Sequence, residues 1–512
     1  MKKSFLILLF SALSQILYSQ KIIEYQSGMG TKDAKNSEIW ILYNNVHATH
    51  EGMDLYADSA HYDTKQNNFT AFDNIKIVLT DTTTIHGDKL FYNGNTRIVE
   101  IWGKEVIFID GETKLITTHL LYNRNTYMAS YTTGGVTTNK ENTLISKKGF
   151  YYSNLKDFFV FDSVLLTNSS SKIITDTLKY NTKTTVALFE SATHIYTDST
   201  TIYSEHGLYN TTDKLAHSDK ATSITNQNQQ LTCDTLDYDE KTKISIARNN
   251  VVVWDSVNNV ICKGNYAYSN EKAHNLFITQ KTTAIFVDNT DSLYLHCDTI
   301  YATTDSSNNF ETIKGFHHVK FYRTDIQGSC DSVFYSIPDS LITMFYTPIM
   351  WNEENQFTAD TIVMKLDSSG IKQIFMNNNA FISQKVDKTK FNQINGKTAI
   401  VYLDGKNPLY CDILGNAQSV FYLTEQQDDG SEALLGVNAG IGSGMRIYFD
   451  ENRRPSRIVT YTNPDMTTYP LKDFPEEKKL LKGFKWWQNR RPLNIDDIYR
   501  HNEEENNDIL TD

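Results

Sequence analysis

The sequence predicts an all-β protein in which hairpin repeats of about 30 residues stack into an elongated sheet that is folded lengthwise. Three observations support this prediction. A motif of the form small–Asp–x–apolar–x–Tyr recurs at nearly constant spacing along the chain. The segments between the motifs are rich in β-branched and aromatic residues, which favour strands. No convincing helical period occurs before about residue 470.

The repeat motif is clearest in four copies, at residues 87–92, 175–180, 233–238 and 330–335. Looser copies end at Tyr62, Tyr122, Tyr152, Tyr209, Tyr268 and Met364, and a displaced copy ends at Ala302. From Tyr62 to Tyr268, the final residues of successive copies lie 28 to 30 positions apart. Chance does not produce so regular a series, so the chain is a repeat array.

Each repeat reads as two strands joined by short turns. Residues 75–79 and 106–109 are β-branched and aromatic, and turn-forming residues stand at 93–95 and 110–111. Two strands with a short connection make each unit a β-hairpin.

Within a unit, the alternation of apolar side chains slips by one residue at the small–Asp pair. Before Asp234 the apolar residues are Leu231 and Cys233, and after it they are Leu236 and Tyr238. Because successive side chains of a strand point to opposite faces, the strand must bulge or bend here to keep one face buried. Stacked bends would fold the sheet into a V or a flattened tube with an apolar interior.

The recurring Asp is expected to cap each bend, with its carboxylate accepting backbone N–H groups that the bend leaves unpaired. Repeated Asp residues can instead bind calcium, but the Gly-rich nonapeptides of calcium-binding solenoids are missing, so no metal site is predicted. The expected bend residues are Asp58, Asp88, Asp176, Asp234, Asp298, Asp331 and Asp360.

The apolar residues of the motif are the candidates for lining the interior. Whether they line an open groove or pack only on each other stays open from the sequence. No G-x-S-x-G or H-E-x-x-H motif occurs, so neither an enzyme nor a cofactor is predicted. The candidate groove residues are Leu90, Tyr92, Leu120, Tyr122, Leu178, Tyr180, Leu236, Tyr238, Val333, Tyr335 and Ile362.

Composition narrows the class of protein. The chain is 40% hydrophobic and 21% charged, so it can bury a core. Its net charge of −12 argues against nucleic-acid binding. Four of the five Cys residues directly precede Asp, which indicates a repeat position rather than a disulfide framework, and strand spacing keeps Cys297 too far from Cys330 to bond.

The two ends differ from the array. Lys2 and Lys3 precede an apolar run, which is typical of a secretory signal peptide over residues 1–19. The aromatic and basic residues between 484 and 491 read either as a cap docked on the last rung or as a contact with a membrane surface or partner. The predicted organisation is a signal peptide at 1–19, a repeat array at 20–424, a linker at 425–443, a terminal strand region at 444–470, and a short helix or cap with an acidic tail at 471–512.

Several segments together resemble the organic-solvent-tolerance (OstA-like) family, in particular its long periplasmic form in Bacteroidetes-type Gram-negative bacteria. The segments are residues 42–46, 55–62, 71–75, 133–136, 143–152 and 415–419, and the similarity runs to about residue 495. The resemblance implies a β-jellyroll or "β-taco" with an apolar groove. The chain departs from the small bridge protein of this family in having about twice as many repeats and a C-terminal extension.

The resemblance also implies a function. It is that of a non-enzymatic periplasmic protein that binds lipopolysaccharide or lipooligosaccharide and carries its lipid A acyl chains along the groove toward the outer membrane. The implied partners are the lipid and other transport-bridge components at the inner and outer membranes, and peripheral attachment at the outer membrane stays open. Exposed terminal strands allow end-to-end self-association. The alternatives are an outer-membrane β-barrel and a β-solenoid that binds surface polysaccharide.

Overall fold

The computed structural model describes residues 22–226, 228–288, 291–307, 309–367, 370–405, 407–426, 432–451, 455–462 and 464–500. The predicted signal peptide and the acidic tail from residue 502 lie outside these residues. Within them the chain is all β apart from short 3-10 turns, which confirms the predicted fold class. None of the helical turns in this part of the chain has the length and apolar character of a membrane span.

The chain forms two compact units. Unit 1 comprises Met1–Asp198 and Glu205–Thr212, and unit 2 comprises Ser199–Ser204 and Asp213–Asp512. The strands of unit 1 are β1 (Glu24–Gln26), β2 (Met29–Lys32), β3 (Ile39–His50), β4 (Met53–Asp63), β5 (Asn68–Thr80), β6 (Thr83–Asn93), β7 (Ile98–Asp110), β8 (Thr113–Asn123), β9 (Met128–Tyr131), β10 (Gly135–Asn139), β11 (Asn142–Ser146), β12 (Lys148–Tyr152), β13 (Asp157–Thr167), β14 (Lys172–Asn181), β15 (Val186–Phe189), β16 (Thr193–Tyr196) and β18 (His206–Asn210).

Unit 2 holds the remaining strands and all the 3-10 turns of the described residues. Its strands are β17 (Thr201–Ser204), β19 (Leu215–Lys220), β20 (Thr222–Thr225), β21 (Gln229–Cys233), β22 (Thr235–Asp239), β23 (Ile244–Asp255), β24 (Val260–Asn270), β25 (Asn275–Phe286), β26 (Leu293–Thr304), β27 (Phe310–Arg323), β28 (Ile326–Ser336), β29 (Leu341–Phe345), β30 (Ile349–Asn352), β31 (Asn355–Thr358), β32 (Thr361–Asp367), β33 (Gly370–Lys385), β34 (Phe391–Asp404), β35 (Asn407–Gln426), β36 (Glu432–Phe449), β37 (Pro455–Tyr461) and β38 (Asp465–Pro470). The 3-10 turns are η1 (Glu271–Ala273), η2 (Leu471–Asp473), η3 (Glu476–Lys478), η4 (Gln488–Arg490) and η5 (Ile495–Tyr499).

Long strands pair antiparallel with the strands before and after them, as in the series β3 to β8. Where a bend interrupts the backbone, one long strand becomes two short ones. In unit 1, β8 pairs with β10 through its first half and with β9 through its second half. In unit 2, β28 pairs with β30 and β29 in the same way. Within each unit, the two halves of the strands therefore build two walls of sheet that meet at the bends.

The bends follow a common geometry in which two residues of one strand stand opposite one residue of the next. In the β5–β6 pair, Phe72 faces Lys89 and Ile75 faces Gly87, so Asp73 and Asn74 together oppose Asp88. Both have left-handed backbones, with φ of 60° and 48°. The burial pattern of β6 slips by one residue at this point. The same left-handed pairs occur at 44–45, 73–74, 162–163, 249–250, 280–281, 317–318, 346–347 and 378–379.

This geometry differs from the sequence prediction in one respect. The prediction placed the bend at the small–Asp pair, whereas the strained backbone lies on the neighbouring strand, opposite the Asp. Asn, Asp and His supply most of these residues because they tolerate the left-handed region better than other non-Gly residues do. The recurring Asp faces the bend and binds to it.

The bonds of the recurring carboxylates also differ from the expectation of backbone caps. Among the recurring Asp residues, and within the described part of the chain, Asp88 alone accepts a backbone N–H, from Lys104 at 2.9 Å. Side chains of the left-handed pairs bind most of the others, and Asp176 stands opposite the pair at 162–163. The bonds are Asn74 Nδ2 to Asp58 at 2.7 Å, Asn250 Nδ2 to Asp234 at 2.9 Å, Asn379 Nδ2 to Asp360 at 3.0 Å, His318 Nδ1 with Asp298 at 2.9 Å, and His317 Nδ1 with Asp331 at 3.2 Å.

We expect Asn379→Val to lower the free energy of unfolding of unit 2 by about 1–3 kcal/mol, because a β-branched residue is strained at a φ of 51°. Asn379→Gly should cost less, since it removes only the amide bound to Asp360. Urea unfolding measures both. Asn377→Val, on an exposed strand position two residues earlier, is the control. If the Val and Gly variants at position 379 were equally stable, the left-handed backbone at this position would not restrict which residue it accepts.

The turn after the repeat Tyr is built by one further side chain. After six of the repeat Tyr residues the next residue is Asp or Asn, and its Oδ1 accepts backbone N–H groups two or three residues ahead. Asp63 accepts from Lys65 and Gln66 at 3.0 and 2.9 Å. The same bonds recur at Asn93, Asn123, Asn181, Asn210 and Asp239. These repeats therefore contain a turn-forming residue directly after the Tyr of the core.

Part of the predicted linker is a strand. Residues 432–443, assigned to the linker at 425–443, form the first part of β36, which pairs with β35 and β38. Glycines in β36 are required by close packing rather than by a loop. A Cβ on Gly436 would stand 2.6 Å from the Tyr469 carbonyl oxygen, and one on Gly442 would stand 2.3 Å from Thr460 Cγ2.

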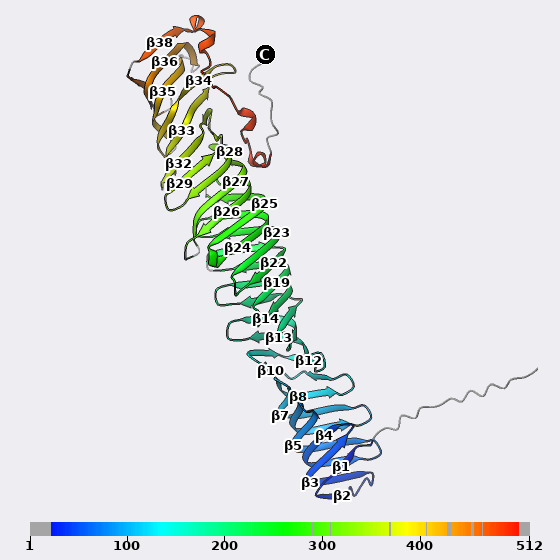
Figure 1. Cartoon of the computed structure of the whole chain (residues 1–512). Helices are drawn as coiled ribbons and strands as arrows, with labels where there is room; N and C mark the ends of the chain where they lie inside the picture. Colours follow the sequence, from blue (N-terminus) through cyan, green and yellow to red (C-terminus); the bar gives the residue numbers. More distant parts are fainter. Residues whose placement is uncertain are drawn as a thin grey trace, which may run out of the picture. The chain divides into compact units, whose positions relative to one another are not determined.

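The chain after β38 turns back along unit 2 (Figure 1). We call residues 471–500 the strap. It begins beside β35 and β36, where Phe474 packs as a cap would, and ends beside β25 and β26, where Tyr499 contacts Thr283 and His296. The aromatic residues Phe484 and Trp486 pack on β33 and β34. The only helical turn described in the segment predicted as a short helix is η3.

Candidate functional site

The interior between residues 62 and 238 is filled by large aromatic side chains. The most deeply buried large side chains are mainly the Tyr and Phe of these copies, including Tyr92, Tyr180 and Phe158. The candidate groove residues of this region, Leu90, Tyr92, Leu120, Tyr122, Leu178, Tyr180, Leu236 and Tyr238, are all at most 3% exposed. They form a close-packed core here, which is the alternative that the sequence left open.

Two of the buried phenols in this core have polar partners. Tyr92 accepts a bond from Arg124 at 2.9 Å and shares one with His50 at 2.6 Å. Tyr151 donates to Asp110 at 2.6 Å. Burial raises the pKa of Tyr92 and, together with Asp110, that of Tyr151, so both phenols stay protonated. These bonds supply the polar partners that buried phenols usually have.

The run of fully buried Tyr residues at the repeat position ends after Tyr238. In later copies the buried residues at or beside this position are Ala267, Ala302 and Met364, and Tyr335 is only partly buried. Tyr268 is turned the other way and stacks on Phe277, at 5.5 Å between ring centroids. A smaller side chain at the same position leaves space in the interior, unless neighbouring side chains fill it.

Space does appear there, as an apolar cavity of about 330 Å³ that we call cavity A. Its walls come from β25 to β29 and from β32 and β33. Two of the candidate groove residues, Val333 and Tyr335, line it, whereas the candidate Ile362 is fully buried outside it. Its aliphatic lining includes Ala284, Leu293, Leu295, Ile300, Ile313, Ile342, Met364, Leu366 and Ile371.

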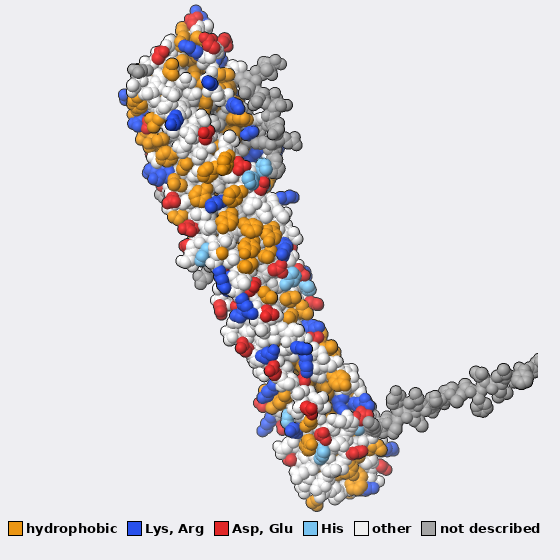
Figure 2. All heavy atoms as spheres, in the orientation of Figure 1, with side chains coloured by type: hydrophobic (Ala, Val, Ile, Leu, Met, Phe, Trp, Pro, Cys, Tyr) orange, Lys and Arg blue, Asp and Glu red, His pale blue; other side chains and the backbone are white. Residues whose placement is uncertain are grey.

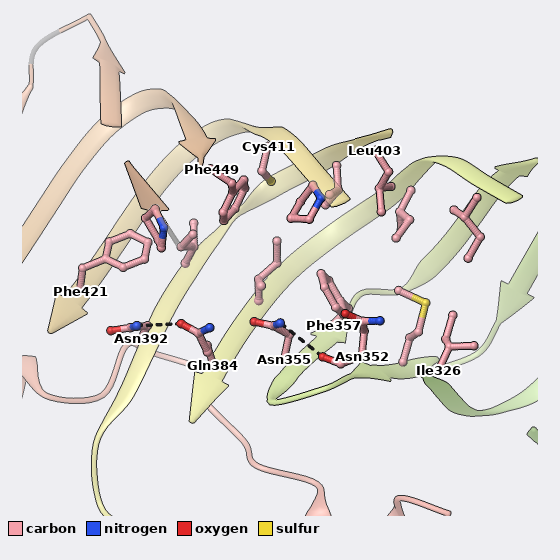
Figure 3. A pocket seen from close by; sticks show the side chains of 18 residues that line it. Ile326, Asn352, Asn355, Phe357, Gln384, Asn392, Leu403, Cys411, Phe421 and Phe449 are labelled. Carbon is pink, nitrogen blue, oxygen red and sulfur yellow. Dashed lines mark hydrogen bonds between the residues drawn. The ribbon is translucent and has the colours of Figure 1, made fainter. Parts of the chain in front are cut away.

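A second apolar cavity, cavity B, has a volume of about 120 Å³ and shares Ile326 and Ile371 with cavity A (Figure 3). It therefore continues the same interior toward the end of unit 2. Its aliphatic and aromatic lining includes Ile374, Ile382, Ile394, Val401, Leu403, Cys411, Phe421 and Phe449.

One edge of cavity B carries a row of amides (Figure 3). The row consists of Asn352, Asn355, Gln384 and Asn392. Asn392 Nδ2 donates to Gln384 Oε1 at 2.9 Å, and Asn355 Nδ2 donates to the Asn352 carbonyl oxygen at 3.3 Å. Phe421, Phe449 and Leu403 lie on the opposite side of the view. The cavity is thus amphipathic, with neutral hydrogen-bonding groups along one edge of an apolar surface.

Charged side chains line only one end of this interior. They are Asp288, Asp291 and Arg323, in cavity A, and Arg323 pairs with Asp325. On the outer surface drawn in Figure 2, acidic and basic side chains are interspersed. In the described part of the chain, no three His, Cys, Asp or Glu side chains are grouped so as to hold a metal ion.

The five cysteines are buried free thiols. This agrees with the spacing argument that kept Cys297 and Cys330 apart. Burial raises the pKa of Cys262 and Cys297 to about 12, and it raises the pKa of Cys411, which lines cavity B. They therefore contribute packing and not nucleophiles.

The wall of the two cavities is covered on its outside by the strap. Neighbouring residues of one strand face opposite ways: Ile394 lines cavity B, while Gln393 contacts the strap. The same division separates Leu295 from His296 in β26. This wall is consequently buried on both faces, which explains runs of buried residues such as 349–351.

Three buried Gln side chains hold the strap. Gln393 Nε2 donates to the Lys479 carbonyl at 2.7 Å and its Oε1 accepts from Leu481 N at 2.9 Å. Gln356 makes the same pair of bonds, to the Lys485 carbonyl and from Trp487 N, both at 2.8 Å. Gln327 accepts from Arg491 Nε at 2.9 Å. Gln393 and Gln356 each offer the strap backbone the donor and acceptor that a neighbouring strand would offer, whereas Gln327 bonds a strap side chain.

Apolar contacts alternate with these polar ones. Phe484 packs on Phe381 and Phe391, with ring centroids 6.1 and 5.0 Å apart, and Trp486 lies 5.1 Å from Phe391. At the far end, Lys320 Nζ donates to the Arg500 carbonyl at 2.6 Å. The strap is thus an integral outer layer of unit 2.

Sequence reasoning identified the repeat positions but missed most of the cavity lining. The available signal was the loss of the terminal Tyr at Ala302 and Met364. Residues such as Ile342 and Ile371 lie between motif copies, where the period does not mark them. The strap has no period and gave no signal of its contacts.

Comparison with known proteins adds the family. Residues 19–176 and 177–285 match the profile of a family described as OstA-like protein, and together they cover just over half of the 512 residues. No curated protein matches the chain. A crystal structure of LptH from Pseudomonas aeruginosa is similar, with 14% identity over 29% of this chain and 99% of that chain and a TM-score of 0.22. Its description makes LptH the LptA-homologous periplasmic component of a lipopolysaccharide transport device. On the strength of the profile match, this chain belongs to the OstA-like protein family.

Proposed function

We propose that this protein is a non-enzymatic periplasmic component of lipopolysaccharide transport, which binds the acyl chains of lipid A in cavities A and B. The apolar interior of unit 2 carries this proposal. Family membership supports the assignment to transport, and the similar LptH structure comes from such a device. Its partners would be lipopolysaccharide or lipooligosaccharide and other bridge components at the two membranes, with end-to-end contact between copies.

Cavities A and B suit this ligand. Each methylene that leaves water contributes about 0.8 kcal/mol, so aliphatic walls hold acyl chains without any specific bond. Neutral amides along one edge of cavity B can bind the hydroxyl and amide groups near the sugar end of such a lipid. The lining of cavity B includes no charge, so a chain can move along it without breaking an ion pair.

The proposal locates binding in unit 2 and not along the whole array. Around Tyr92 and Tyr180 the interior is occupied by buried aromatic rings, whereas cavities A and B lie in unit 2. The cavities begin at Ala284, where the family match ends. The N-terminal repeats then serve as a spacer in the transport path.

A photo-crosslinking amino acid tests this site. Placed at Tyr335, which lines cavity A, it should capture lipopolysaccharide in intact cells. Phe334 is the matched control, because it is the next residue of β28 and faces the other way, beside Lys314. A second control at Leu90 probes the filled core. Equal capture at 334 and 335, or capture at neither, would contradict the proposed site.

A further inference from the structure

The strap carries a charge opposite to that of the rest of the protein. The whole chain has a net charge of −12, but residues 478–491 contain Lys478, Lys479, Lys482, Lys485, Arg490 and Arg491 and no acidic residue. We call these residues the cationic strip. We propose that the cationic strip binds the surface of an anionic lipid bilayer.

The strip is fixed with one side on the sheet. Its backbone at Lys479, Leu481, Lys485 and Trp487 is bonded to Gln393 and Gln356, and Phe484 is buried against β33 and β34. These contacts use the inward side of the strip. The side chains of Lys482 and Lys485 are exposed to solvent as a result.

The exposed side of the strip also has aromatic and aliphatic character. The Trp487 ring lies 4.4 Å from the Arg490 guanidinium and 5.2 Å from Lys485 Nζ, measured to the ring centroid. Leu480 within the strip is 39% exposed, and beyond it Leu493 and Ile495 are 62% and 40% exposed. Cations interleaved with Trp and Leu are the composition of a bilayer-interface contact.

A bilayer fits these features better than a soluble polyanion does. Exposed Leu and Ile gain nothing beside a phosphate backbone, but they can enter the acyl boundary while Lys and Arg stay among the head groups. Three cations of the strip bond to other side chains of the protein. Lys478 binds the Tyr469 hydroxyl, Lys479 pairs with Glu476, and Arg491 bonds Gln327. We therefore assign the contact with lipid head groups to the other three cations, Lys482, Lys485 and Arg490.

Vesicle cosedimentation of the full chain tests the proposal. Wild type should bind vesicles that contain phosphatidylglycerol and not vesicles of phosphatidylcholine alone, and high salt should reverse the binding. The triple variant K482Q/K485Q/R490Q should bind the anionic vesicles on the order of a hundredfold more weakly. Trp487→Ala should also weaken binding, although its backbone bond to Gln356 is kept.

The matched control is K65Q/K114Q/K183Q, which removes three exposed cations from unit 1. It changes net charge equally and should bind as wild type does. If both triple variants lost vesicle binding equally, net charge and not the strip would explain the binding, and the proposal would be overturned. Unchanged vesicle binding by the strip variant would also overturn it. Binding that needs an acidic protein and not lipid would also overturn it. The inference does not require lipid in cavities A and B: the strip variant should still capture lipopolysaccharide at 335, so the two proposals fail separately.

Discussion

Replacing Gln393 by Leu should lower the free energy of unfolding of unit 2 by roughly 2–4 kcal/mol. The Gln393 side chain is fully buried, and it alone offers partners to the Leu481 N–H and the Lys479 carbonyl. Leu fills a similar volume but leaves both groups without a hydrogen bond. Equilibrium unfolding in urea measures the change, and limited proteolysis reports whether the strap detaches first.

Gln488→Leu provides the comparison for this change. Gln488 lies in the same strap and is exposed, so the same substitution should change stability by no more than about 0.5 kcal/mol. A Gln393→Leu variant that is as stable and as protease-resistant as Gln488→Leu would show that the Gln contacts do not hold the strap.

Filling cavity A with Ile342→Trp should reduce lipopolysaccharide capture at residue 335 by at least tenfold while the protein stays folded. Ile342 lines cavity A, whose volume of about 330 Å³ can take the larger ring. The ring then occupies the space that an acyl chain would use. Capture is measured by photo-crosslinking, and folding is measured by thermal unfolding.

Leu90→Trp applies the same kind of change to the filled core. Leu90 is 0% exposed, so the added volume should cost about 3 kcal/mol. If Ile342→Trp left the protein stable and Leu90→Trp destabilised it, the interior would have space at residue 342 and none at residue 90. If Ile342→Trp left capture at wild-type level, the lipid would have to bind outside cavity A.

The sequence was informative where structure repeats and uninformative where it does not. The Tyr positions predicted the strands and their inward residues, because a period near 30 residues is visible without any knowledge of the fold. The motif placed the inward residue one position too late at Tyr152 and Tyr268, because the buried residues there are Tyr151 and Ala267. A shift of one residue moves a side chain to the other face, and the motif alone does not detect it.

The bends and the strap show two further limits. Each bend is built by residues of two strands, so the Asp of the motif was visible but the left-handed pair opposite, such as Asn378 and Asn379, was not connected to it. Residues 432–443 were predicted as part of a linker, although they begin β36, in which Gly442 packs closely against Thr460. The strap lacks periodicity, so its contacts could be found only in the structure.

The strap also affects the order in which the protein can fold. Repeats such as β5 to β8 bind neighbours that are made within a few tens of residues, so each can form as soon as it has been synthesised. The wall of cavity A cannot be completed in this way, because Thr283 meets Tyr499 only after 216 further residues. The outer face of that wall therefore stays uncovered until the last part of the chain arrives. Any chain that ends early would present an intact spacer with an unfinished binding site.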